Sequence, residues 1–177
     1  MISDLSEIKS KNVLLKNGLN VHYLETGYEE NKLKPCIIML HGFPELSYSF
    51  RKIMLYIGKH GFHIIAPDQR GYGSTIGWSK DLLNLNKFNM LTLANDIYQL
   101  KKSLSIEKSP IILGHDFGST VASFCSLLYP NNFSKLIIMS TPFTGPPNSS
   151  YFDYDKSNSI YSINQKLNNL HPPKKHY

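Results

Sequence analysis

A glycine-flanked aspartate between a buried strand and a helix constrains this chain more than any other feature. Residues Gly114–Gly118 read Gly-His-Asp-Phe-Gly, directly after the apolar run Ile111–Leu113 and before a helix-patterned segment that starts near Ser119. Small residues at both ends of the motif let the strand and helix backbones approach closely, so the side chain of Asp116 projects from a sharp bend at a helix N-terminus. An isolated motif of this kind also fits a plain helix cap.

Short apolar runs alternate with helical periodicities along the rest of the chain. The runs typical of strands buried on both faces are Cys36–Leu40, Phe62–Ala66, Ile111–Leu113 and Leu136–Met139. Apolar residues at three-four spacing predict amphipathic helices within 50–57, 93–104 and 121–128. A hairpin that turns at Asn17-Gly18 is expected before them. The alternation predicts a three-layer α/β fold with a mostly parallel sheet and functional loops at the carboxyl ends of its strands.

The character of the sequence changes after Phe143. The 177 residues fit one domain with a substantial core. Beyond Phe143 the chain continues through Gly145-Pro146-Pro147 into a polar segment that stops at Pro172-Pro173. We therefore interpret residues 1–143 as the amino-terminal part of the sheet domain and residues 144–177 as the start of a cap or lid.

Charge and cysteine usage indicate which partners and compartment to expect. The net charge of +6 comes from scattered lysines without an arginine-rich block, so no nucleic-acid partner is expected. The first residues lack the pattern of a signal peptide and no stretch has the length of a membrane span, so no membrane partner is expected either. Cys36 and Cys125 fall in a buried strand and on an apolar helix stripe, which favours free thiols and a cytoplasmic location.

Further motifs follow the predicted strands at the edge of the sheet where the aspartate lies. They are His41-Gly-Phe-Pro-Glu-Leu46, Pro67-Asp-Gln-Arg-Gly-Tyr-Gly73 and Ser140-Thr-Pro-Phe143. A carboxylate at the bend can attack an electrophilic carbon and form an alkyl ester, whereas a serine there would perform acyl transfer. This chemistry suits epoxides and alkyl halides.

Taken in order, these motifs and Gly114-His-Asp-Phe-Gly-Ser119 closely resemble those of cap-bearing epoxide hydrolases of the α/β-hydrolase fold. The resemblance runs from about Asn12 to Tyr177 but covers only about the first half of the family's domain plan. It implies a truncated α/β-hydrolase fold with an incomplete cap. It also implies hydrolysis of a small hydrophobic epoxide to a diol through an aspartyl ester, without a metal or organic cofactor.

The resemblance assigns roles to individual residues. Asp116 would be the nucleophile, and the backbone N–H groups of Phe43 and Phe117 would form an oxyanion hole. The Phe43-Pro44 peptide bond is expected to be cis. Tyr177 lies where the first ring-opening tyrosine of the cap would be expected, and weaker candidates for this acid are Tyr151, Tyr154 and Tyr161.

Other residues near the motifs have more open interpretations. Tyr72, Trp78 and Phe143 fit the lining of a substrate pocket and fit core packing equally well. Asp68 and Arg70 are expected to pair and shape their loop. His115, beside the nucleophile, is expected to be structural because its side chain would turn away from the substrate.

The second half of the family reaction needs a base. A histidine paired with an acidic residue normally follows later strands, and neither His171 nor His176, both beside proline and lysine in the tail, is expected to take that role. The chain is therefore expected to be inactive or to alkylate itself once.

Three alternatives remain beside the epoxide hydrolase. Haloalkane and haloacid dehalogenases resemble the chain, but they generally hold halide or substrate with donor side chains, whereas Phe43 and Phe117 have none. A non-catalytic fragment that binds apolar ligands is a second alternative. An esterase that uses Ser119 is disfavoured because Ser119 falls inside the helix. The oligomeric state is left open.

Overall fold

The structure is a computed structural model that describes residues 5–30, 33–78 and 87–141. The chain divides into two compact units, residues 1–143 and 144–177, and all described residues belong to the first unit. Of the expected site residues, Phe143 and Tyr177 lie outside the described residues. The assignment of 144–177 to a cap stays a prediction.

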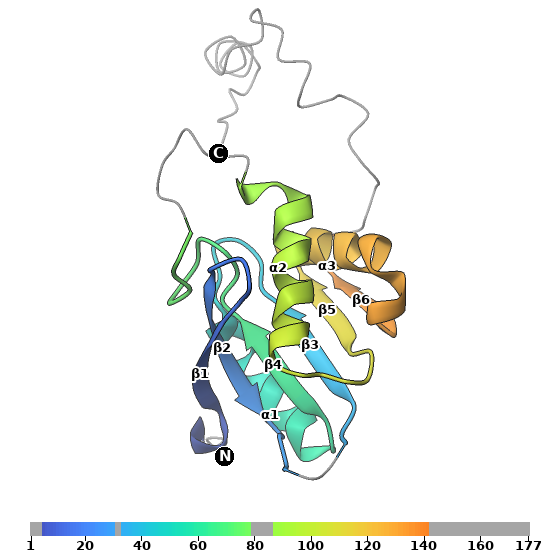
Figure 1. Cartoon of the computed structure of the whole chain (residues 1–177). Helices are drawn as coiled ribbons and strands as arrows, with labels where there is room; N and C mark the ends of the chain where they lie inside the picture. The colour runs from blue at the N-terminus through green and yellow to red at the C-terminus, as the bar shows by residue number, and fades with distance from the viewer. Residues whose placement is uncertain (1–4, 31–32, 79–86, 142–177) are drawn as a thin grey trace, which may run out of the picture. The chain divides into compact units, whose positions relative to one another are not determined.

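The described strands form one mixed sheet (Figure 1). They are β1 (Lys9–Leu14), β2 (Asn20–Thr26), β3 (Cys36–Leu40), β4 (His63–Pro67), β5 (Ile111–His115) and β6 (Lys135–Met139). Their order in the sheet is β1-β2-β4-β3-β5-β6. The β1–β2 hairpin is antiparallel and joins β4 in antiparallel register, whereas β4, β3, β5 and β6 run parallel. The predicted hairpin and all four predicted strands are present. The prediction that Leu136–Met139 is buried on both faces is wrong, because all residues of the edge strand β6 are exposed among the described residues.

Helices cover both faces of this sheet, as the alternation predicted. They are α1 (Arg51–Lys59), α2 (Met90–Ser103) and α3 (Phe117–Leu128), with short 3-10 turns η1 (Leu5–Glu7), η2 (Ser47–Phe50) and η4 (Pro130–Asn132). Helices α2 and α3 lie on one face and α1 lies on the other (Figure 1). Asn89 begins α2 with a side-chain cap, because its carboxamide oxygen accepts a hydrogen bond from Thr92 N at 2.8 Å.

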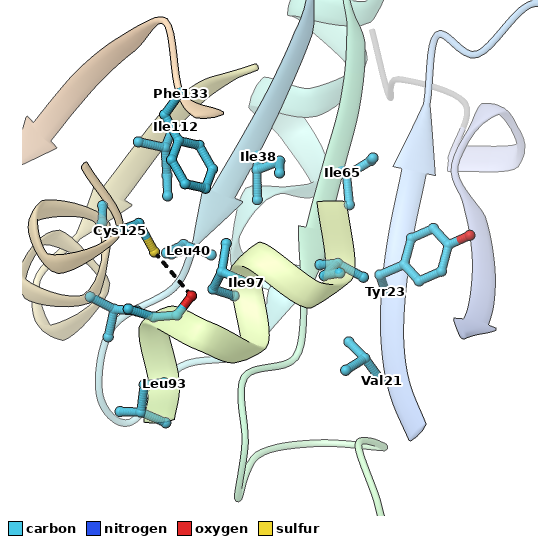
Figure 2. Packing of buried hydrophobic residues seen from close by; sticks show 14 of the residues in the cluster. Val21, Tyr23, Ile38, Leu40, Ile65, Leu93, Ile97, Ile112, Cys125 and Phe133 are labelled. Carbon is cyan, nitrogen blue, oxygen red and sulfur yellow. Dashed lines mark hydrogen bonds between the residues drawn. The ribbon is translucent and has the colours of Figure 1, made fainter. Parts of the chain in front are cut away.

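The larger of the two apolar clusters lies between the sheet and the helices α2 and α3 (Figure 2). Ile38, Ile65 and Ile112 of the central strands are fully buried there. They pack in one cluster with Ile97 of α2 and Cys125 of α3. Both cysteines are free and buried, and burial raises the pKa of the Cys36 thiol to about 12. The prediction that both cysteines are free thiols in apolar surroundings is confirmed.

A buried ion pair joins the loop after β4 to helix α2. The guanidinium of Arg70 donates to both carboxylate oxygens of Asp96, at 2.7 and 2.8 Å. Asn17 in the hairpin turn donates to the same carboxylate at 2.7 Å. The expected pairing of Asp68 with Arg70 is wrong. Asp68 instead faces His22, at 2.8 Å, on the neighbouring strand, while the long arginine side chain reaches α2.

We expect Asp96→Ala to destabilise the domain by about 3–5 kcal/mol, because it leaves the Arg70 cation buried without a partner. The free energy of unfolding in urea measures this effect. Glu7→Ala is the matched control, since it removes an exposed ion pair with Lys59 and should change stability by less than about 1 kcal/mol. Equal losses in the two variants would contradict the prediction.

Candidate active site

Asp116 occupies a strained bend between β5 and α3. Its φ of 50° and ψ of −121° lie in a region that residues with side chains rarely adopt. A Cβ atom on Gly114 would lie 2.2 Å from the carbonyl oxygen of Gly118, and one on Gly118 would lie 2.1 Å from that of Leu40. Both positions therefore need glycine. Because the chain turns within one residue, α3 begins at Phe117, two residues before the expected start.

The loop after β3 brings a backbone donor to the Asp116 carboxylate. Phe43 N donates to Asp116 Oδ1 at 3.0 Å, and the Phe43-Pro44 bond is cis, as expected. Gly42 permits this approach, since a Cβ there would lie 2.6 Å from Asp116 Cβ. Hydrogen bonds from the N–H groups of Phe43 and Phe117 hold the pKa of the Asp116 carboxyl below its ordinary value. The carboxylate is thus half-buried, ionised and held by two backbone donors.

Glu45 links this loop to the bend. Its Oε2 accepts from Gly42 N at 3.1 Å and lies 2.8 Å from His115 Nδ1. The hydrogen bond from His115 lowers the pKa of the Glu45 carboxyl. This contact agrees with the structural role expected for His115. Glu45 belongs to the motif His41–Leu46, but no role was predicted for it. Its spacing of three residues from Gly42 was the available signal.

A buried histidine supports the loop from beneath. His41 Nε2 accepts from Gln69 N at 3.1 Å, and its Nδ1 lies 2.9 Å from the carbonyl oxygen of Gly42. Burial lowers the pKa of His41, so the neutral ring donates from Nδ1. Tyr72 packs its ring edge against His41 at 4.8 Å between centroids. Burial and the charge of Asp116 raise the pKa of Tyr72.

Trp78 and Ser119 both lie in packed surroundings. Trp78 donates to the carbonyl oxygen of Thr75 at 3.0 Å and meets Phe88 edge-on at 5.7 Å between centroids. These contacts match the packing interpretation of Trp78. Ser119 is buried, and its hydroxyl lies within 3.0 Å of two backbone carbonyl oxygens. Its hydroxyl is therefore not available as a nucleophile.

The histidines of the described ranges all have ring partners other than Asp116. Those partners are Asp68 and Ser10 for His22, Gly42 and Gln69 for His41, Tyr56 for His60, Glu25 for His63 and Glu45 for His115. The described histidines thus include none that hydrogen-bonds to the carboxylate of the bend. His171 and His176 lie outside the described residues.

A cavity of about 360 Å³ lies away from the bend. Its lining includes Cys36 and His63, the first residues of β3 and β4, whereas Asp116 follows the last residue of β5. The cavity therefore opens at the amino ends of the parallel strands, opposite the edge where α/β folds place their ligands. Within the described ranges, no group of three or more histidine, cysteine or acidic side chains is arranged to hold a metal ion. No described helix is long and apolar enough to cross a membrane.

Comparisons with known proteins show epoxide hydrolases among the proteins that this chain resembles. An epoxide hydrolase of Caballeronia sordidicola is 32% identical over 153 residues, which are 86% of this chain and 44% of that protein. Epoxide hydrolase 3 of Siraitia grosvenorii is 34% identical over 127 residues, 72% of this chain and 37% of that protein. The chain thus spans less than half the length of these relatives.

Solved structures show the same fold. Epoxide hydrolase I of potato (Solanum tuberosum) has a TM-score of 0.74 and 33% identity, covering 89% of this chain and 47% of that one. The epoxide hydrolase of Vigna radiata has a TM-score of 0.75 and 29% identity, covering 93% and 48%. The family described as alpha/beta hydrolase fold matches residues 35–161, a range that contains the bend and the loop that contacts it. Because this match spans most of the sequence, the chain belongs to the alpha/beta hydrolase fold family, as an epoxide hydrolase-like member.

Proposed function

We propose that the chain contains the nucleophilic half of an epoxide hydrolase-type site, in which Asp116 opens an epoxide by forming an alkyl ester. The observation that supports this most is the 3.0 Å hydrogen bond from Phe43 N to Asp116 Oδ1 at a strained bend. The relatives and solved structures described above are epoxide hydrolases, which supports the substrate class.

In the first step one carboxylate oxygen attacks a ring carbon. Because Phe43 N binds Oδ1, we assign the attack to the other carboxylate oxygen of Asp116. The carbon–oxygen bond of the epoxide breaks, and the ring oxygen takes a proton from an acid. Tyr177 is our proposal for that acid by resemblance to the family, and we propose Tyr72 as a residue of the substrate pocket.

In the second step water cleaves the ester. Water attacks the ester carbonyl carbon, and negative charge develops on the carbonyl oxygen, which is Oδ1 of Asp116. The N–H groups of Phe43 and Phe117 would stabilise that charge. A general base must activate the water, and no described histidine hydrogen-bonds to Asp116. Loss of such a base costs about 10²–10⁴ in rate, so we propose that residues 1–177 stop at the ester.

A dehalogenase is the second candidate, because the same carboxylate could displace halide from an alkyl halide. Neither the Phe43 nor the Phe117 side chain has a hydrogen-bond donor for a leaving halide, which favours the epoxide. A fragment without chemistry is the remaining alternative.

We expect the 177-residue chain to gain the mass of one molecule when it is incubated with a reactive aryl epoxide, without sustained diol formation. The added mass should map to Asp116, and Asp116→Ala should lose it. Intact-mass and peptide spectrometry follow the ester, and chromatography follows the diol. Glu107→Ala, at a carboxylate on the connection between α2 and β5, is the matched control and should still be alkylated.

The outcomes separate the candidate functions. Sustained diol formation would contradict the proposal that the chain lacks a general base. His171 and His176 would then be the candidates for that base. The absence of any adduct would favour the inert fragment. An adduct with an alkyl halide but not with the epoxide would favour the dehalogenase.

The rate of alkylation should be constant from about pH 7 to about pH 4.5, because the lowered pKa keeps Asp116 ionised over this range. The pH at which the rate drops to half its maximum should lie below 3.8, the ordinary pKa of an aspartate. Initial rates from intact mass, read alongside circular dichroism to confirm folding, measure the profile. A midpoint of this pH profile above about 4 in folded protein would show that the backbone donors do not lower the pKa of Asp116.

Glu45→Gln should slow alkylation by about tenfold, the effect of weakening one hydrogen bond to a charged group. The amide can still accept from Gly42 N but loses the charge-assisted contact with His115. The lowered pKa of Glu45 predicts that its stabilising contribution is present above 4.5 and lost as pH falls, so the difference between variant and parent should shrink in acid. Equal rates for variant and parent at neutral pH would refute a positioning role for Glu45.

A further inference from the structure

A serine, a histidine and an aspartate form a hydrogen-bonded chain at the opposite end of the sheet from β5. Ser10 Oγ lies 2.8 Å from His22 Nε2, and His22 Nδ1 lies 2.8 Å from Asp68 Oδ2. Ser10 is exposed on the edge strand β1, whereas the side chains of His22 and Asp68 are 15% and 4% exposed. A nucleophile, a base and an orienting group within hydrogen-bond reach are the signature of an activated hydroxyl.

The partners fix the direction of both hydrogen bonds. Burial opposes the charge of Asp68, but hydrogen bonds from Ser47, Ser74 and His22 outweigh it and keep the pKa of Asp68 low. An ionised Asp68 only accepts, so His22 must donate from Nδ1. The neutral ring then has a lone pair on Nε2, which accepts the Ser10 hydroxyl. This is the tautomer that a general base needs.

Backbone contacts hold this arrangement in place. Asp68 accepts from Ser47 N at 2.9 Å and from Ser74 N at 3.0 Å, so the carboxylate is fixed before any reaction. His22 N donates to Thr75 Oγ1 at 3.0 Å, and His22 O accepts from Asp68 N at 2.9 Å. Three strands, β2, β4 and β3, separate β1 from β5 in the sheet, so the hydroxyl of Ser10 is distinct from the carboxylate of Asp116.

We propose that Ser10 is a second nucleophile of this chain, activated by His22 and Asp68, which takes acyl or phosphonyl groups from activated esters. With an aryl ester, a bond forms between Ser10 Oγ and the acyl carbon, and the bond from that carbon to the phenolate oxygen breaks. The hydroxyl proton passes to His22 Nε2 and leaves with the phenolate as phenol. Water, deprotonated by His22, then attacks the acyl carbon, the bond from that carbon to Ser10 Oγ breaks, and His22 returns the proton to Oγ as the acid leaves.

A fluorophosphonate tests this proposal on the intact 177-residue chain. The reagent forms an oxygen–phosphorus bond with an activated serine and releases fluoride, so each modified serine is found by peptide mass spectrometry. We expect one phosphonyl group, on Ser10. Ser134→Ala is the matched control, because Ser134 is exposed and its hydroxyl contacts no histidine within the described ranges. This variant should label at the parent rate, whereas Ser10→Ala should not label.

Two measurements distinguish an activated serine from a merely structural contact. His22→Gln should slow labelling of Ser10 by about 10²-fold or more, the usual effect of a general base. Labelling of Ser10 in the parent should slow by a similar factor when the chain is unfolded in urea. This second measurement tests the folded geometry without a variant that could misfold. Ser10 left unmodified in the folded parent would overturn the proposal, and so would labelling of Ser10 at the rate of Ser134 or at an equal rate in urea.

Discussion

The close approach of three backbone segments around Asp116 is the constraint on which the candidate site depends. The end of β3, the end of β5 and the start of α3 meet where Gly42, Gly114 and Gly118 leave no room for a Cβ atom. This contact brings Phe43 N within 3.0 Å of the nucleophile candidate. A methyl group at any of the three glycines would push these segments apart, and backbone displacement of this kind is costly for a reaction that depends on positioning.

Buried polar pairs connect this constraint to the rest of the domain. Arg70 and Asp96 tie the loop after β4 to α2, while Gln69, one residue before Arg70, holds His41 beneath the loop with Phe43. A charged group can be buried only with its partners in place, so these pairs specify one arrangement of the loops. The apolar core positions the strands and helices, and the polar pairs then fix the loops between them.

The sequence predicted the elements well because local periodicity determines them. The apolar runs and the Asn17-Gly18 turn correspond to the strands and hairpin found, and α3 differed only in its first turn. Contacts between distant residues were less predictable. Arg70 is 26 residues from Asp96, and Glu45 is 70 residues from His115, so no local pattern links them. The expected Asp68–Arg70 pair does not form, because the two side chains, although close along the chain, contact different elements: His22 for Asp68 and Asp96 for Arg70.

The two backbone donors at Asp116 have different effects on the two proposed steps. Hydrogen bonds from Phe43 and Phe117 lower the pKa of the free carboxylate and make it a weaker nucleophile, so the benefit of these donors to ester formation is that they position the carboxylate. In the ester the same oxygen is a neutral carbonyl, and its negative charge returns only when water adds to the carbonyl carbon. Because catalysis requires stronger interaction in the transition state than before it, charge stabilisation by these donors would favour the proposed ester hydrolysis more than ester formation. The geometry of the loop at Phe43 is therefore best matched to the second step of the proposed reaction.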